Sequence, residues 1–250
     1  MLVVMSDTLF DEWIAQRYEA LWPELFDPAV VDPAVSFLAE LAAPHGPALE
    51  FGVGTGRIAL PLSRRGIRVH GIELSRAMIA QLQMQQGGSD IGVTIGDLAT
   101  ASAGTTFRLV YLLRNTITNL TTQDEQVAAF RNAATHLEPG GCFVVENYVP
   151  ELQRLPPGET VHVFSATPTH LGFEEYDVAT QIAISHHQWM IEGQLKTFSS
   201  PHRYVWPSEL DLMARLAGMT LRERHSGWNR EPFSGGSRSH ISVWGKPRTG

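Results

Sequence analysis

The sequence predicts an α/β protein built on a doubly wound, seven-stranded, mostly parallel β-sheet. Three observations support this fold class: strand-like and helix-like segments alternate through residues 46–150, a glycine-rich loop follows the first strand, and two more strand-like segments close the chain. In such an alternation each helix carries the chain back, so that consecutive strands run parallel and helices cover both faces of the sheet.

Two helices are expected before the first strand. The first begins at Asp7, presents an apolar face and ends before Pro23. The second begins at Asp32, which is followed by a proline suited to the first helical position, and ends at Pro44. We expect these helices to form a cover that comprises residues 1–45.

Residues 46–150 are expected to form the main part of the sheet. Short apolar runs are separated by helical patterns and by turns rich in glycine. The expected strands are 48–51, 67–72, 91–95, 107–113 and 142–148, and the expected helices are 56–65, 75–85 and 122–136.

The sequence changes in character over residues 151–206. Segments rich in Val, Ile, Thr, Phe and Tyr without helical periodicity predict an antiparallel β-ribbon insertion of about three strands, placed beside the main sheet. These strands are 159–166, 171–187 and 194–205. In residues 207–250 we expect a helix from Pro207 to Leu216 and a hairpin of Thr220–Arg224 with Ser239–Trp244, so that all 250 residues form one domain.

The composition is that of a globular protein. The chain is 43% hydrophobic with a formal net charge of -7, which favours a buried core and disfavours general binding to nucleic acid or anionic membranes. No apolar run reaches the roughly 20 residues that span a bilayer, and the N-terminus lacks the features of a signal peptide. The single cysteine, Cys142, cannot form an internal disulfide. We expect a cytoplasmic protein without nucleic-acid or membrane partners.

The strongest local signal is the glycine-rich loop Glu50–Gly56, which joins the first strand to its helix. Glycines let a ligand approach the backbone closely, and the N–H groups at a helix start favour polar ligands. The dinucleotide fingerprint G-x-G-x-x-G does not fit, because its last glycine would fall on Arg57. Glu50 would repel a pyrophosphate and suit a ligand that carries an ammonium group.

Two further acids follow later strands. Glu73 follows the second expected strand, where a carboxylate can accept hydrogen bonds from a ribose diol, and Asp97 follows the third, where it can accept one from an adenine amino group. The carboxyl ends of parallel strands form the edge at which open α/β sheets bind ligands. The three acids therefore predict one ligand site.

Over nearly its whole length the sequence resembles the class I S-adenosylmethionine-dependent methyltransferases. The matching segments are Glu50–Gly56, Glu73, Gly96-Asp97, Phe107–Asn119 and Leu137–Gly141. The resemblance implies a Rossmann-like methyltransferase fold with S-adenosylmethionine as cofactor. The cofactor-binding residues that it implies are Tyr18, Glu50, Gly52, Gly54, Glu73, Leu74, Asp97, Leu98, Leu113 and Arg114.

The resemblance also implies individual roles. Glu50 would face the methionine ammonium, Glu73 the ribose and Asp97 the adenine. Leu113 and Arg114 would line the methionine and sulfonium region, and the tyrosine of the helical cover, Tyr18, would close over the cofactor carboxylate.

Within the family, Arg114-Asn115-Thr116 and the β-ribbon look most like small N-methyltransferases of natural-product pathways. These include sugar amine dimethyltransferases of macrolide biosynthesis and the N-terminal methyltransferase of linaridin peptides. This narrower resemblance implies a small-molecule or peptide acceptor that offers an amine. It leaves a homodimer open and does not identify the acceptor.

The sequence does not assign a catalytic base. The sugar-amine relatives place a histidine after the fourth strand, where this chain has Asn119, whose amide cannot take up a proton at neutral pH. The acceptor-side candidates are Asn119, Tyr148 at the end of the fifth strand and His162 in the insertion. Trp13 of the cover is a further candidate for lining the acceptor pocket.

A metal site is not expected. His186 and His187 are adjacent in a strand and would point to opposite faces. His170 with Glu174 and Glu175 is a possible ligand cluster, but nothing in the sequence fixes its geometry.

Other functions of the same fold stay open. O-methylation and non-catalytic binding of S-adenosylmethionine by a scaffold protein are the alternatives, whereas Glu50 and Arg57 disfavour a dinucleotide oxidoreductase. Nucleic-acid methylation is disfavoured because Arg114-Asn115-Thr116 stands where adenine N6 enzymes carry an Asn/Asp-Pro-Pro-aromatic motif. A group of arginines near the C-terminus is expected to form a solvated face or to hold an acidic acceptor: Arg222, Arg224, Arg230 and Arg238.

Overall fold

The computed structural model describes residues 10–44 and 46–248. The strands of the main sheet, sheet A, are β1 (Ala48–Phe51), β2 (Val69–Glu73), β3 (Gly92–Ile95), β4 (Phe107–Leu112), β5 (Leu137–Tyr148), β10 (Thr220–His225) and β11 (Ser239–Gly245). Their order is β10-β11-β5-β4-β1-β2-β3. The first five strands pair in parallel, and β11 pairs antiparallel with β5 and β10. The predicted seven-stranded, mostly parallel sheet is confirmed.

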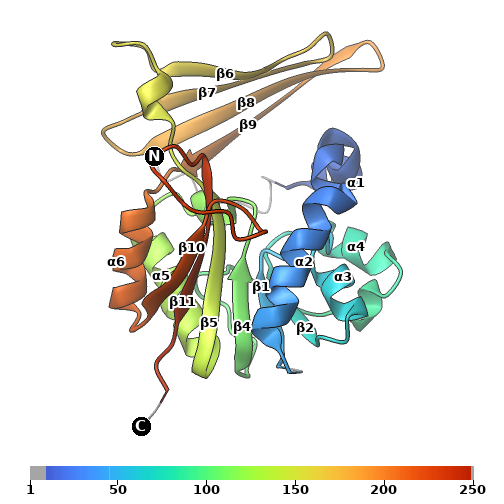
Figure 1. The fold of residues 1–250 in the computed structure, drawn as a ribbon. Coiled ribbons are helices and arrows are strands. Elements are labelled where there is room, and N and C mark those ends of the chain that lie inside the picture. The colour runs from blue at the N-terminus through green and yellow to red at the C-terminus, as the bar shows by residue number, and fades with distance from the viewer. Residues whose placement is uncertain (1–9, 45, 249–250) are drawn as a thin grey trace.

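Helices cover both faces of sheet A (Figure 1). The covering helices are α2 (Pro28–Ala42), α3 (Ala59–Arg64), α4 (Arg76–Met84), α5 (Gln123–His136) and α6 (Pro207–Leu216). Helix α1 (Glu12–Leu21) instead packs against α4, beyond the end of the sheet (Figure 1). The short 3₁₀ turns are η1 (Pro23–Phe26), η2 (Gly88–Asp90), η3 (Thr116–Asn119) and η4 (Leu152–Arg154). Because successive strand side chains alternate, β5 sends Cys142 to the core under α2 and α3 and Phe143 to the core under α5 and α6. None of the helices in the described part of the chain is long and apolar enough to cross a membrane.

The start of α2 corrects the sequence prediction. The helix begins at Pro28, after Asp27, whose carboxylate accepts a hydrogen bond from the backbone N–H of Ala29 at 2.8 Å. The Asp27-Pro28 pair supplies the same start signal as Asp32-Pro33, so the expected start at Asp32 was wrong and Pro33 lies inside the helix. The expected start of the first helix at Asp7 lies outside the described residues, and α1 itself begins after the N-cap residue Asp11.

The insertion also differs from its prediction. It is a separate sheet of four antiparallel strands, sheet B, in the order β6 (Val161–Ala166), β7 (His170–Asp177), β8 (Ile182–Ile191) and β9 (Gln194–Arg203). The segment expected as one strand over 171–187 contains a turn, where Asp177 accepts hydrogen bonds from Ala179 N and the Thr180 hydroxyl. Neither glycine nor proline marks this turn, so the sequence did not reveal it.

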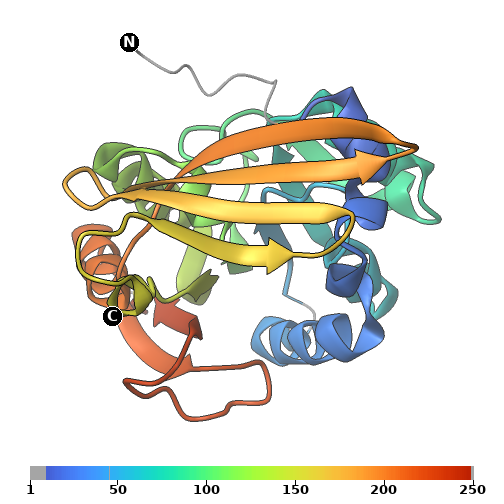
Figure 2. The same cartoon turned by 90° about the horizontal axis from the view of Figure 1, so that it is seen from above.

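Sheet B lies across the end of sheet A and forms a roof over the core rather than extending it sideways (Figures 1 and 2). Arg203, at the end of β9, fixes this arrangement from a buried position. Its guanidinium donates hydrogen bonds to Gln126 of α5 at 2.6 Å, to Gln181 at 2.9 Å and to Glu209 of α6 at 3.0 Å. One buried arginine therefore ties the roof to two helices of the core.

Candidate active site

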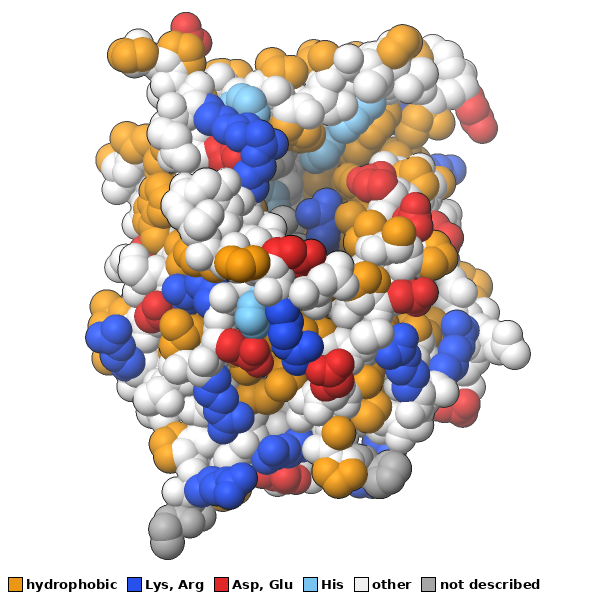
Figure 3. All heavy atoms as spheres, in the orientation of Figure 1, with side chains coloured by type: hydrophobic (Ala, Val, Ile, Leu, Met, Phe, Trp, Pro, Cys, Tyr) orange, Lys and Arg blue, Asp and Glu red, His pale blue; other side chains and the backbone are white. Residues whose placement is uncertain are grey.

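A cavity of about 860 Å³ lies between the carboxyl edge of sheet A and the inner face of sheet B. Figure 3 shows the hollow, with histidine side chains on its roof. The loops after β1 to β5 form its floor, and residues of α1 and η1 contribute a wall. Every residue expected at the cofactor site lines this cavity, and so do the three acceptor-side candidates Asn119, Tyr148 and His162.

The glycine-rich loop turns tightly on the floor of the cavity. Gly52 and Gly54 have φ angles of 69° and 54°, a conformation that favours glycine. A Cβ atom at Gly52 would lie 3.0 Å from the Thr116 methyl group, so the loop passes directly against η3. Among the described residues, the buried hydroxyl of Thr55 in this loop has no hydrogen-bond partner. The loop thus presents its backbone to the cavity and keeps one unsatisfied hydroxyl buried beneath it.

Glu50 is a buried carboxyl group at the end of β1. Burial raises its pKa to about 8, although a hydrogen bond from the Tyr111 hydroxyl, at 3.0 Å, and the charge of Arg57 act in the opposite direction. The ion pairs among the described residues do not include Glu50. A cationic group in the cavity would supply the charge partner that the protein itself does not give this carboxylate.

Glu73 and Asp97 continue the row of acids along the neighbouring strands. Glu73 accepts hydrogen bonds from Gly54 N and Ser75 N, both at 2.9 Å, and burial raises its pKa. Asp97 accepts one hydrogen bond within the described residues, from Ala99 N at 2.7 Å. Backbone donors therefore fix both carboxylates while their remaining lone pairs stay available to a ligand.

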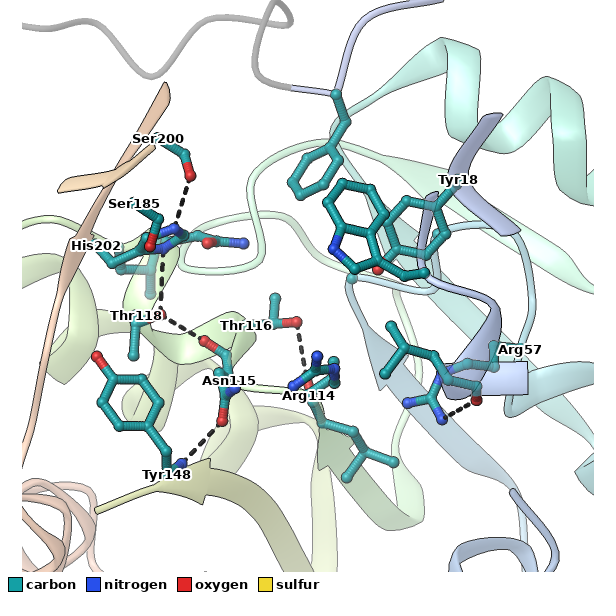
Figure 4. Close-up of a pocket in the computed structure, with 18 of the residues that line it drawn as sticks. Tyr18, Arg57, Arg114, Asn115, Thr116, Thr118, Tyr148, Ser185, Ser200 and His202 are labelled. Atoms are coloured by element: carbon teal, nitrogen blue, oxygen red, sulfur yellow. Dashed lines mark hydrogen bonds between the residues drawn. The ribbon is translucent and has the colours of Figure 1, made fainter. Parts of the chain in front are cut away.

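The turn after β4 separates the two halves of the cavity (Figure 4). Arg114 and Asn115 both adopt the left-handed conformation, with φ of 52° and 59°. Their neighbours on β5 hold this turn: Arg114 N donates to Glu146 at 2.8 Å, and Asn115 accepts from Tyr148 N at 2.8 Å. Backbone strain of this kind persists where surrounding contacts fix it and concentrates at functional sites.

Tyr18 and Arg57 lie on one side of this turn, and Tyr148, Thr118 and His202 lie on the other (Figure 4). Burial and the nearby charge of Glu174 raise the pKa of the Tyr148 hydroxyl, so the phenol stays protonated at neutral pH. We refer to the half with Tyr148 as the acceptor side and to the half with Glu50 as the cofactor side.

His202 of β9 is a cavity residue that the sequence did not single out. Its Nε2 atom lies 2.8 Å from the Ser200 hydroxyl and its Nδ1 atom 3.4 Å from the Thr118 hydroxyl. Because the Thr118 hydroxyl donates to the Asn115 carbonyl at 2.7 Å, it can only accept from Nδ1–H. Nε2 is then the basic nitrogen, and it accepts from Ser200. Burial lowers the pKa of His202, which keeps the ring neutral.

Aromatic rings cover the other end of the roof. The rings of His170 and His187 stack at a centroid distance of 5.2 Å, and His187 stacks on Trp189 at 4.9 Å. Trp22 of the cover packs edge-on against Trp189 at 5.7 Å. Trp13 does not line the cavity as expected, because its ring packs against Trp189 at 6.5 Å and so joins the cover to the roof.

The side chains considered as possible metal ligands do not come together in the described residues. His170 contacts His187 at 3.0 Å rather than Glu174 or Glu175, and no group of three or more His, Cys, Asp or Glu side chains suited to a metal ion occurs in the described residues. The four C-terminal arginines each have a different partner within the protein, and three of them, Arg222, Arg230 and Arg238, are exposed to solvent. These partners are Gly140 for Arg222, Asp211 for Arg224, Glu40 for Arg230 and Glu151 for Arg238.

Comparisons with known proteins identify the class. A family model described as a methyltransferase domain matches residues 48–141. The solved structure of the CcbJ methyltransferase from Streptomyces caelestis is 36% identical and superposes with a TM-score of 0.85, covering 98% of this chain and 100% of that chain. The protein therefore belongs to the class I methyltransferases, and it is an S-adenosylmethionine-dependent enzyme.

Two further relatives are similar over most of their length. The cypemycin N-terminal methyltransferase of Streptomyces sp is 26% identical over 253 residues, which cover 96% of this chain and 98% of that protein. CalS10 is an amino pentose methyltransferase from Micromonospora echinaspora, and its structure with S-adenosylmethionine bound has the same fold. The TM-score is 0.68 at 24% identity, over 92% of this chain and 96% of that chain.

Proposed function

We propose that this enzyme transfers the methyl group of S-adenosylmethionine to an amine of a small molecule or peptide. This proposal rests on one observation, the two-part composition of the cavity. The cofactor side contains three acids at strand ends, and the acceptor side contains the buried, neutral ring of His202. Two of the similar proteins are the N-terminal methyltransferase of cypemycin and the amino pentose methyltransferase CalS10, which is consistent with an amine acceptor. Because both halves of the cavity are needed, we propose that the 250 residues act as one domain.

The cofactor-side residues fit the polar groups of S-adenosylmethionine. We propose that Glu50 binds the ammonium group, Glu73 the ribose diol and Asp97 the adenine amino group. Gly52 and Gly54 allow close approach of the cofactor to the loop. The remaining contacts would come from Tyr18, Leu74, Leu98, Leu113 and Arg114, all of which line the cavity.

When bound, the cofactor supplies a sulfonium methyl group as the electrophile. The protein has to hold the acceptor nitrogen in line with that methyl group, exclude water and remove one proton. Orientation of this kind contributes about 7–11 kcal/mol to lowering a barrier. Asn119, Tyr148 and His162 are placed to orient the acceptor from the floor and the roof.

His202 is suited to take the proton. An acceptor that enters as an ammonium ion gives one proton to Nε2 of His202, directly or through the Ser200 hydroxyl, which donates to Nε2 as it accepts from the amine. The nitrogen lone pair then forms the new N–C bond as the C–S bond breaks, and the electron pair stays on sulfur. The methylated nitrogen carries the positive charge.

Incubation with labelled S-adenosylmethionine and paired acceptors tests the proposal. Each pair consists of an amine and the alcohol of the same skeleton, drawn from arylalkylamines, amino sugars and peptides with free or acetylated N-termini. We expect methylation only of the members with a free amine, detected by mass spectrometry. Methylation of the alcohols would instead establish O-methylation, and tight cofactor binding without methylation of any amine in the set would contradict the proposed amine acceptor.

A further inference from the structure

Glu174 lies in the middle of the inner face of sheet B and lines the cavity. Alternate residues of β7 lie on the same face of the strand, so the side chains of Glu174 and Tyr176 share the inner face. The next residue, Glu175, points outward and is exposed. Glu174 is also directly opposite Ser185 of β8 in the strand register. Its carboxylate is therefore presented to the acceptor side by the roof.

Two hydroxyl groups hold this carboxylate in place. The Tyr176 hydroxyl donates to one oxygen, and the Ser185 hydroxyl donates to the other at 3.0 Å. The ion pairs among the described residues do not include Glu174. A half-buried carboxylate that is oriented by neutral donors and faces a cavity is a complementary site for a cation.

An apolar surface adjoins the carboxylate. Phe164 is the extra residue at a register shift of β6, and a Cβ atom at Gly172 would collide with its ring. The glycine therefore lets the ring lie across β7 two residues before Glu174, on the same face of the strand. The ring of His187 packs against Phe164 at 5.3 Å and against Phe198 at 6.2 Å. Burial and neighbouring histidines lower the pKa of His187 to about 4, so this surface carries no positive charge at neutral pH.

We propose that Glu174 binds the ammonium group of the acceptor and that Phe164, His187 and Phe198 receive its apolar body. This inference rests on the proposed amine methylation and names the substrate class: amines that are cationic at neutral pH and carry a ring or an apolar chain beside the nitrogen. A hydroxyl group in the same position would leave the carboxylate without a counter-charge. The site therefore selects amines over alcohols before any chemistry occurs.

The probes that test this are phenethylamine and phenethyl alcohol, which differ only in the ammonium and hydroxyl groups. Their affinities are measured by ligand-observed NMR titration at neutral pH, with the enzyme saturated by S-adenosylhomocysteine. We expect the wild-type enzyme to prefer the amine by about tenfold or more, the range of a hydrogen bond to a charged partner. Glu174→Gln removes the charge but keeps the size, and we expect it to abolish the preference.

Glu175→Gln is the matched control, because it removes the same charge one residue away on the outer face of the roof. It should keep the preference for the amine, and both variants should keep the wild-type affinity for S-adenosylhomocysteine. A preference that survives Glu174→Gln overturns the assignment of Glu174 and leaves amine methylation standing. A wild-type enzyme without any preference for the amine overturns the proposed amine acceptor as well.

Discussion

The protonation state of Glu50 should make cofactor affinity depend strongly on pH. Burial raises the pKa of this carboxyl group to about 8 in the free protein, so it holds a proton at neutral pH. The ammonium group of the cofactor needs the carboxylate form. Binding should therefore expel the proton, and affinity should rise with pH up to the pKa of Glu50.

The size of the effect follows from the pKa. With a value of about 8, roughly one-tenth of Glu50 is ionised at pH 7 and roughly one-hundredth at pH 6. Affinity should therefore increase about tenfold between pH 6 and pH 7, with close to one proton released per cofactor bound, and it should level off above pH 8.

Titration calorimetry with S-adenosylhomocysteine, which keeps the same ammonium group, measures both quantities. Parallel titrations at pH 7 in phosphate and in Tris, whose ionisation enthalpies differ greatly, give the number of protons released. Glu50→Gln should flatten the pH profile. Tyr111→Phe removes a hydrogen bond that lowers the pKa of Glu50, so the profile should shift to higher pH and binding at pH 7 should weaken.

Equal binding enthalpies in the two buffers would mean that no proton is released. If the affinity also does not change between pH 6 and pH 8, the proposed deprotonation of Glu50 on cofactor binding is wrong. Affinity that stays pH dependent in the Glu50→Gln variant would place the released proton on another group.

Three further predictions concern other parts of the structure. Asp97→Ala should weaken the binding of S-adenosylhomocysteine about tenfold or more, measured by calorimetry. Substitution of the exposed Asp90 by Ala is the control and should have no effect. An unchanged affinity in Asp97→Ala would refute the assignment of Asp97 to the adenine. Burial lowers the pKa of His202, and the neutral ring is the proposed base, so the methylation rate should fall with decreasing pH only below the ordinary histidine pKa of about 6.5. This decrease should be absent in His202→Gln. The same decrease in that variant would exclude His202 as the base. Arg203→Met should lower the free energy of unfolding by about 3–5 kcal/mol in denaturant titrations. Arg230→Met, which removes an exposed ion pair, should lower it by less than about 1 kcal/mol. Similar decreases for the two variants would contradict the role of Arg203 in anchoring sheet B.

The main sheet could be predicted because its signals are local. Alternating strands and helices specify parallel pairing, and the topology then brings Glu50, Glu73 and Asp97 to one edge without further information. The error at α2 has a local cause too, because Asp27-Pro28 and Asp32-Pro33 are equivalent start signals and only packing distinguishes them.

The acceptor side could not be predicted in the same way. Its position depends on how sheet B lies on the core, and long-range contacts such as those of Arg203 with α5 and α6 determine that placement. Strand residues alternate between two faces, but the sequence does not show which face of sheet B is turned toward the cavity, so His202 was not singled out. Glu174 was distinguished from Glu175 only by the structure.

The connections of sheet B to the rest of the chain have a consequence for how such enzymes diversify. The sheet forms its own hydrogen-bonded ladder, and the chain enters and leaves it through two segments, residues 149–160 and 204–206. The family model ends at residue 141, before the sheet begins. With the proposed division of the cavity, we expect substitutions in the roof to change the acceptor while the residues that bind the methyl donor stay the same, which makes the roof a unit to graft between relatives.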